Sequence, residues 1–151
     1  MALHDFTGAP GVYKSHASMD KDFMWDCIVR DLEKKYVLVC TAKTGGVEEG
    51  IVADHAYSIL SAHAFERDGE QVKLLKIRNP WGYKEWSGAW GDDSEEWNTI
   101  DPSMKETLWD GHESKNDGKF FISYDDYLAN YQGIFLCQVK DENCYSSISH
   151  E

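Results

Sequence analysis

The sequence predicts an α+β domain in which antiparallel strands dominate and one substantial helix lies near the start. Three observations carry this prediction: apolar runs of β-branched and aromatic residues between turn signals, one amphipathic segment, and an Asp-Gly step between two long strand-like runs. At 151 residues the chain is long enough for one domain with a hydrophobic core. We expect that domain over residues 1–140, followed by a polar tail over residues 141–151.

The first part of the chain combines a loop with the main helix. Glycine and proline predict a loop over residues 7–16. Apolar side chains then recur at helical spacing and predict an amphipathic helix over residues 18–35. Either Ser18 or Asp20 is expected to cap its first turn.

Strand signals dominate the middle of the chain. The β-branched and apolar residues 36–42 predict a buried strand, and the glycine-rich residues 44–50 predict a loop. Two long strand candidates follow over residues 53–66 and 71–79. Because the turn between them contains an Asp-Gly step, we expect a tight antiparallel hairpin.

Shorter elements complete the prediction. Residues 84–90 are expected to form a short strand, and the acidic residues 92–108 to hold two helical turns, one near Trp97 and one after Pro102. The remaining predicted elements are a strand over residues 119–123, a short helix over 124–131 and a last strand over 133–140.

The composition argues against several classes of partner. Fifteen Lys and Arg against 27 Asp and Glu give a net charge of −12, which repels nucleic acids and anionic membranes. Cationic peptides and divalent cations suit such a surface better, although acidity also serves solubility alone. No apolar run is long enough to predict a membrane span, and the first ten residues lack the features of a signal peptide.

The cysteines predict a reducing compartment. Cys27, Cys40, Cys137 and Cys144 lack CxxC spacing and have no histidines paired with them, which argues against a zinc site. In a chain without an export signal they are expected to be thiols of a cytoplasmic protein.

One pair of residues suggests catalysis. His55, in DHAYSIL, and Asn79, in IRNPWG, have the identities of the base and the orienting amide of a thiol protease. Trp81 supplies an indole that could cover their hydrogen bond and exclude water. A turn near residues 68–69, however, pairs Asn79 with about Ser58 rather than His55. That offset of roughly three residues, or about 10 Å, requires a bulge, a longer turn or strand twist. Without one, the pair is an ordinary strand histidine beside an asparagine at a strand end.

Several sequence blocks resemble one family. GIVADHAYSIL, VKLLKIRNPWG, EWSGAWGDDSEEW, IDPSMKETL and DGKFFISYDDYL resemble, in order and spacing, the second protease-core domain of calpains, which are calcium-regulated, papain-like cysteine proteases of the cytoplasm. The resemblance is strong over residues 50–139 and looser before them, where ALHDFTG is similar to the opening of that domain. It implies a papain-like C-terminal-half architecture, with His55 as catalytic base, Asn79 as its orienting partner and Trp81 as cover and cleft wall.

The resemblance also implies an incomplete active site. The family's nucleophile belongs to a preceding domain in a QGxxGDCW-like motif, and nothing in this chain matches it. Asp26-Cys27 echoes the motif's last part, but its spacing places Cys27 on the apolar face of the predicted helix. We therefore expect the chain to be inactive alone and to need a Cys-bearing partner subdomain to cleave protein substrates. The alternative is a non-catalytic calpain-like scaffold or regulatory binding module.

A calcium site is implied only in part. By resemblance, Glu85, Asp92, Asp117 and the Lys115 carbonyl match family calcium ligands. Lys119 stands where the family usually has Glu, which predicts weak or absent calcium binding and an ion pair of Lys119 with Asp92 or Asp117. The alternative is that these acids form a solvated surface.

Other candidates give weaker signals. Ser58 and Ser61 near His55 suggest a serine hydrolase, but no GxSxG elbow is present. Neither the remaining histidines nor nearby acids show metal-ligand spacing. Four tryptophans are expected to anchor the core and loops: Trp86, Trp90, Trp97 and Trp109.

Overall fold

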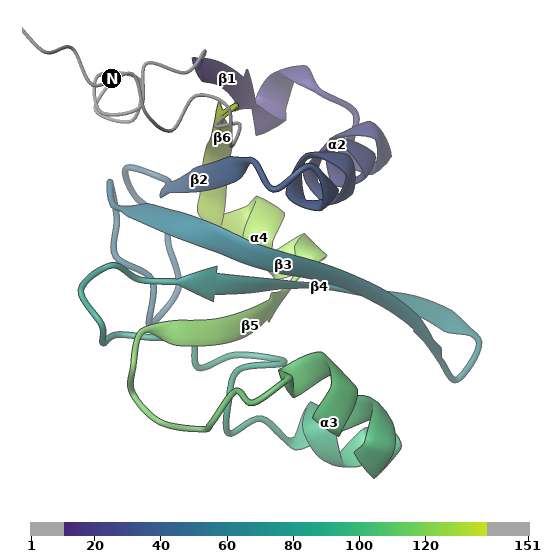
Figure 1. Cartoon of the computed structure of the whole chain (residues 1–151). Helices are drawn as coiled ribbons and strands as arrows, with labels where there is room; N and C mark the ends of the chain where they lie inside the picture. The colour runs from purple at the N-terminus through teal and green to yellow at the C-terminus, as the bar shows by residue number, and fades with distance from the viewer. Residues whose placement is uncertain (1–10, 139–151) are drawn as a thin grey trace, which may run out of the picture.

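The computed structural model describes residues 11–138 and shows a six-stranded sheet of order β1-β6-β2-β3-β4-β5 (Figure 1). Every neighbouring pair of strands is antiparallel, as predicted. The strands are β1 (Gly11–Ser15), β2 (Val37–Ala42), β3 (Ala56–Arg67), β4 (Glu70–Arg78), β5 (Lys119–Ser123) and β6 (Tyr131–Cys137). The helices are η1 (His16–Ser18), α2 (Lys21–Glu33), η2 (Glu95–Thr99), α3 (Pro102–Trp109) and α4 (Tyr124–Asn130). The ALHDFTG segment, Cys144 and the predicted tail lie outside the described residues.

The main helix begins one residue after its cap. The Asp20 carboxylate accepts the backbone N–H groups of Asp22 and Phe23, so Asp20, and not Ser18, is the N-cap. Ser18 instead donates its hydroxyl to the Ser15 carbonyl. The two helical turns predicted within residues 92–108 are η2 and α3, and the short helix predicted after β5 is α4.

Two local predictions are wrong. Residues 11–15 form the edge strand β1 and not a loop, because GVYKS pairs along its whole length with β6. Residues 84–90 form no strand. Lys84 and Trp90 both have positive φ, and the Trp86 side chain is buried, so this segment turns repeatedly instead of extending.

The β3–β4 hairpin is the longest feature of the sheet and projects beyond its neighbours (Figure 1). Asp68 and Gly69 both have positive φ in its two-residue turn, as an Asp-Gly step favours. The register shifts once, between Ile59 and Ser61, where Leu60 is the extra residue of a bulge.

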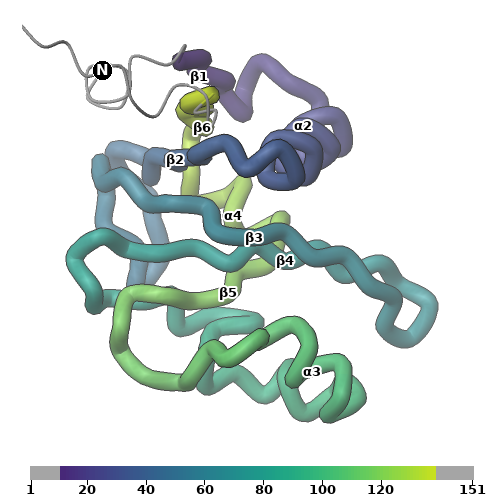
Figure 2. The backbone as a smooth tube through the Cα atoms, in the orientation of Figure 1, coloured from purple at the N-terminus to yellow at the C-terminus, as the bar shows by residue number. Residues whose placement is uncertain are grey.

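Side chains on both faces of the sheet are buried. One face packs against α2 and α4 and contains Tyr57, Leu75, Ile77, Phe120 and Ile122. The other contains Leu74 and Phe121, which pack against three tryptophans and Leu108. These residues come from the long connection between β4 and β5, whose path is shown in Figure 2. Three tryptophans, Trp86, Trp90 and Trp97, are buried as predicted, whereas Trp109 is half-buried.

Candidate functional site

The bulge in β3 decides which face Asn79 occupies. With an unbroken hairpin, Asn79 would stand opposite Ser58 and point away from the His55 side of the sheet. The bulge makes Ser58 pair with Arg78, so the residue after Arg78 comes level with Tyr57. His55 lies two residues before Tyr57, on the same face. A diagonal pair of this kind is within side-chain reach across an antiparallel ladder.

His55 and Asn79 are hydrogen-bonded, with 2.9 Å between His55 Nε2 and Asn79 Oδ1. Asn79 is fully buried, and its amide orientation is fixed by two further bonds. Oδ1 also accepts the backbone N–H of Trp81 at 3.1 Å, and Nδ2 donates to the Lys84 carbonyl at 3.1 Å. Because Oδ1 is the acceptor, His55 Nε2 carries the hydrogen and Nδ1 keeps its lone pair. Nδ1 is therefore the atom available to accept a proton.

The turn after β4 places an indole over this bond. Gly82 donates its N–H to the Asn79 carbonyl at 3.0 Å and closes a four-residue turn with Pro80 at its second position. The turn brings the Trp81 ring centroid to 4.4 Å from that of His55. Trp81 is 47% exposed and stacks on the exposed ring of Tyr83. Trp81 thus covers one side of the imidazole and presents its remaining surface to solvent.

A residue that the sequence did not single out supports Asn79. The backbone N–H of Asn79 donates to the Gly118 carbonyl at 2.7 Å, and Gly118 donates its own N–H to Glu85 Oε1 at 2.6 Å. Gly118 has φ +87°, and a Cβ there would lie 2.6 Å from the Asn79 carbonyl oxygen. The Asp117-Gly118 step predicts a turn, but no sequence signal places that turn against Asn79.

The described cysteines are not placed as nucleophiles. Cys27, Cys40 and Cys137 are all buried, in agreement with the apolar helix face predicted for Cys27 and the buried strand predicted over residues 36–42. The Cys40 thiol donates to the Tyr57 carbonyl at 3.6 Å, and burial raises the pKa of this thiol strongly, which opposes formation of a thiolate.

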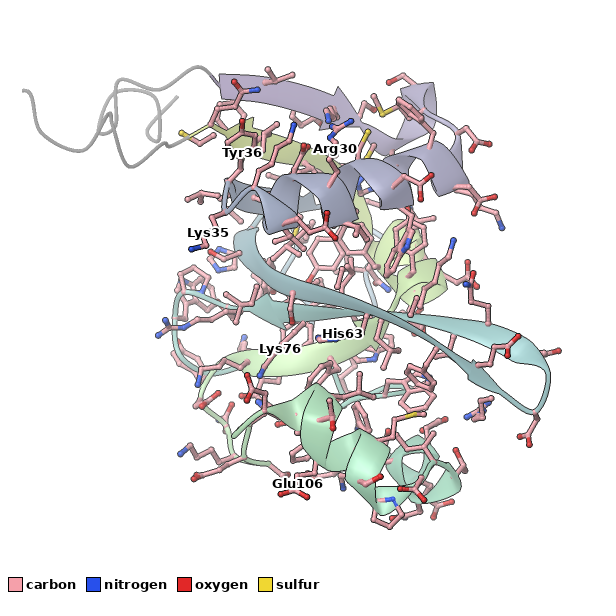
Figure 3. All side chains as sticks on the ribbon, turned by 45° about the vertical axis from the view of Figure 1, so that its right-hand side comes forward. Arg30, Lys35, Tyr36, His63, Lys76 and Glu106 are labelled. Carbon is pink, nitrogen blue, oxygen red and sulfur yellow. The ribbon has the colours of Figure 1, made fainter. Side chains whose placement is uncertain are left out.

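The serine candidates do not join His55. Ser61 is instead hydrogen-bonded to His63 Nε2 at 2.9 Å. His63 and Lys76 lie close together on the sheet (Figure 3), and burial together with the charge of Lys76 lowers the pKa of His63. Within residues 11–138, His63 is therefore bonded to a hydroxyl and not to a side-chain amide, in contrast to His55.

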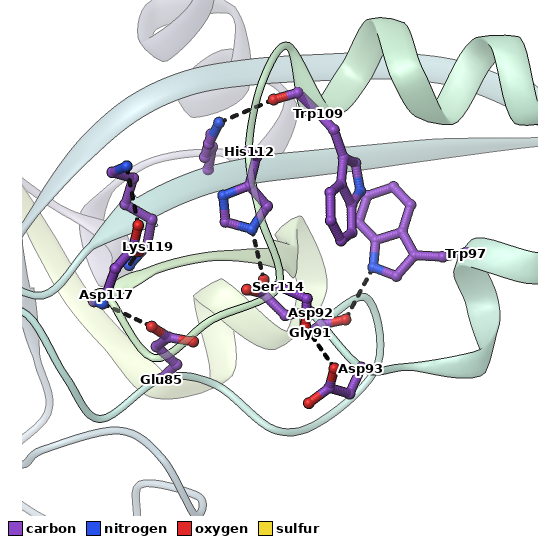
Figure 4. A network of polar contacts seen from close by, with 12 residues as sticks. Glu85, Gly91, Asp92, Asp93, Trp97, Trp109, His112, Ser114, Asp117 and Lys119 are labelled. Atoms are coloured by element: carbon purple, nitrogen blue, oxygen red, sulfur yellow. Dashed lines mark hydrogen bonds and ion pairs between the residues drawn. The ribbon is translucent and has the colours of Figure 1, made fainter.

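The acids matched to calcium ligands are engaged by protein groups (Figure 4). Asp92 Oδ1 lies 2.9 Å from His112 Nε2, with both side chains buried. Asp117 accepts both the backbone N–H and the ammonium of Lys119, at 3.0 and 3.1 Å. Burial and the charges of Asp92 and Asp117 raise the pKa of Glu85, against the opposing effect of the Gly118 N–H.

These residues do not fit a calcium ion. Asp92 Oδ2 is buried without a hydrogen-bond partner, and Asp92 lines a cavity of about 300 Å³ together with Glu85 and Asp93. Across residues 11–138, no group of three or more His, Cys, Asp or Glu side chains is arranged to hold a metal. Calcium requires roughly six to eight oxygen ligands. Here the Lys119 ammonium, which is not a calcium ligand, lies beside the Asp117 carboxylate.

No helix within residues 11–138 has the length and apolarity needed to cross a bilayer.

Comparison with known proteins places the chain in a family. The protein-family model described as "Calpain family cysteine protease" matches residues 1–138 of the chain. The chain is 34% identical over 148 residues to calpain clp-4 of Caenorhabditis elegans, covering 93% of the chain and 20% of that protein. It is 42% identical over 96 residues to the calpain-2 catalytic subunit of Homo sapiens, covering 64% of the chain and 13% of that protein. Identity to calpain-8 of Rattus norvegicus is 32% over 156 residues, covering 99% of the chain and 22% of that protein.

The chain thus spans about a fifth or less of the length of these relatives. The family model covers nearly all of the chain, and its residues include the whole sheet and the His55–Asn79 pair. The chain belongs to the calpain family of cysteine proteases.

Proposed function

We propose that this chain is the histidine- and asparagine-bearing half of the protease core of a calpain-like cysteine endopeptidase. The observation that carries the proposal is the 2.9 Å hydrogen bond between His55 Nε2 and Asn79 Oδ1 beneath the Trp81 ring. In this role the nucleophilic cysteine comes from another subdomain, and the chain alone does not cleave peptides.

His55 is the general base and then the general acid. Its Nδ1 lone pair takes the proton of the incoming thiol and forms a thiolate–imidazolium pair. After the thiolate attacks the scissile carbonyl, the imidazolium gives that proton to the leaving amine. Nδ1 then takes a proton from the water that hydrolyses the thioester.

Asn79 and Trp81 keep the base oriented. The buried Asn79 amide accepts the Nε2–H in both protonation states without adding a charge. Trp81 excludes water from that bond, and a hydrogen bond in such surroundings is electrostatically stronger than in water. The exposed part of the indole lines the side of the cleft where an extended substrate passes.

The proposal names the partners by their chemistry. They are a Cys-bearing protease-core subdomain of the parent chain and protein substrates with accessible, extended segments. Buried thiols at Cys27 and Cys40 agree with a reducing, intracellular setting. The net charge of −12 disfavours nucleic acid.

The parent protein, with both protease subdomains, tests the proposal. The H55A variant should lose hydrolysis of a fluorogenic peptide, and alkylation of its active thiol by iodoacetamide near pH 6 should slow because the thiolate is no longer stabilised. The H63A variant is the matched control, since His63 is a sheet histidine bonded to Ser61, and it should retain both properties.

Two results would contradict the proposal. Full peptidase activity in H55A would remove His55 from catalysis. A parent protein that binds peptides, cleaves none and shows no fast-alkylating thiol would instead support the scaffold role.

A further inference from the structure

The loop before β5 and the turn after β4 are joined by hydrogen bonds between protein groups. The N–H of Lys84 donates to Asn116 Oδ1 at 3.1 Å. Glu85 Oε1 accepts the Gly118 N–H, and the Gly118 carbonyl accepts the Asn79 N–H. Each of these bonds ties the 79–85 segment to the 116–118 segment. The position of Asn79, and through it that of His55, therefore depends on the conformation of the loop.

Lys119 fixes that loop at its last residues. Its ammonium lies 3.1 Å from Asp117 Oδ2, while its backbone N–H binds Asp117 Oδ1. One residue therefore satisfies both oxygens of Asp117 and closes a tight turn around Gly118. Asp117 and Lys119 are 23% and 38% exposed at their side chains, so the pair is only partly screened by water.

The neighbouring acid is held in a similar way. Asp92 is bound by His112 (Figure 4). The His112 ring also contacts the rings of Trp109 and Phe121. The three carboxylates that resemble metal ligands are thus each engaged by a different group: Glu85 by a backbone N–H, Asp92 by an imidazole and Asp117 by an ammonium.

We propose that Lys119 is a built-in cation that takes the place of calcium in this domain and positions Asn79 without it. The ammonium neutralises Asp117 and holds the turn that presents the Gly118 carbonyl to Asn79. Lys119 is a positioning residue, since it acts on His55 only through Gly118 and Asn79. Its catalytic consequence rests on the proposed function, whereas its effect on calcium binding and on the loop does not.

The test compares four versions of this chain: wild type, K119E, K119M and K34E. K34E is the matched control because it makes the same charge change at an exposed lysine outside the 79–85 and 116–118 segments. Melting temperature and calorimetric titration are measured with CaCl2, and with MgCl2 at equal ionic strength. Hydrogen exchange of the Asn79 backbone N–H, which donates to the Gly118 carbonyl, is measured by NMR.

Wild type and K34E should show no calcium-dependent rise in melting temperature. K119E should bind calcium and, at about 100-fold excess over its Kd, melt roughly 5–10 °C higher. K119M should remain unresponsive to calcium, and its Asn79 amide should exchange roughly two- to fivefold faster than in wild type. In K119E, calcium should slow that exchange again.

Three results would overturn the proposal: a calcium response in wild type equal to that of K119E, no response in K119E, or unchanged Asn79 exchange in K119M. If K119E does not fold, K119M and wild type still decide the matter. None of these measurements uses proteolysis, so a failure here is distinct from a failure of the protease assignment.

Discussion

The backbone N–H of Asn79 donates to the Gly118 carbonyl at 2.7 Å, so the residue that holds His55 is itself held by the loop before β5. These residues lie far apart in the chain, and no side chain of Gly118 takes part. The contact requires the backbones to approach closely, which φ +87° and the missing Cβ of Gly118 allow. The His55–Asn79 pair, which we propose to be catalytic, therefore depends on a glycine that has no reactive side chain.

The first prediction concerns that glycine. The G118A variant should lose about 2–4 kcal/mol of unfolding free energy, because its Cβ meets the Asn79 carbonyl oxygen at 2.6 Å and its φ is positive. Urea unfolding measures this loss. The matched control is G69A, which has φ +81° and nothing within 4 Å of its added Cβ.

G69A should lose only about 1 kcal/mol, the cost of the backbone conformation without a clash. Equal losses in the two variants would show that the approach of Gly118 to Asn79 contributes nothing.

The second prediction concerns the Asn79 side chain. In the parent protein, N79A should lower kcat roughly 10²-fold, the lower end of what a positioned general base contributes, because the imidazole loses its orienting acceptor. KM should change little. The N98A variant is the control, because Asn98 is exposed, and it should leave kcat unaltered. A wild-type kcat in N79A would remove this amide from the mechanism.

The third prediction concerns the β3 bulge. Deleting Leu60 should remove the bulge but leave Ile59 opposite Ile77 and Ser58 opposite Arg78, because only the unpaired residue is lost. Asn79 should stay on the His55 face, and the slowly exchanging Nε2–H of His55, followed by NMR, should remain.

The control for the deletion is L60A. Leu60 is 42% exposed, so truncating it should change stability by no more than about 0.5 kcal/mol and leave the His55 signal in place. Loss of the His55 signal in the deletion variant would contradict the prediction, because it would show that the pairing register of β3 and β4 does not by itself align His55 with Asn79.

The fourth prediction concerns pH. Burial, and secondarily the charge of Lys43, lowers the pKa of His16 below its ordinary 6.5, against the opposing hydrogen bond to the Tyr131 carbonyl. The unfolded chain therefore binds this proton more readily than the folded one. The contribution of neutral His16 to the free energy of unfolding is therefore complete above about pH 6.5. It is lost as pH falls below that value, by at most about 1.4 kcal/mol per pH unit.

Urea unfolding between pH 7.5 and pH 5 in roughly equal steps measures this dependence. The H16N variant should show a shallower decline than wild type, because its side chain does not titrate. The double variant H16N/H63N should be shallower still, since burial also lowers the pKa of His63. Identical slopes in wild type and H16N would contradict the prediction.

Local signals accounted for most of the secondary structure. The Asp20 cap, the Asp-Gly turn and the β-branched runs act within a few residues, so α2 and the β3–β4 hairpin could be predicted from the sequence. Strand β1 could not, because it forms by pairing with β6, more than 100 residues away. The strand predicted over residues 84–90 failed for a similar reason. Burial of Trp86 and two positive φ angles override its local preference.

The sequence by itself determined the identity of the candidate site: His55, Asn79 and Trp81 in family-like blocks, and a lysine at position 119. Only the tertiary structure decided their relationship. A one-residue bulge brought Asn79 to the His55 face, and the Gly118 carbonyl holds it there. The tertiary structure also decided that the Lys119 ammonium pairs with Asp117 and not with Asp92. Residue types are properties of single positions, whereas register and close approach depend on how distant segments pack.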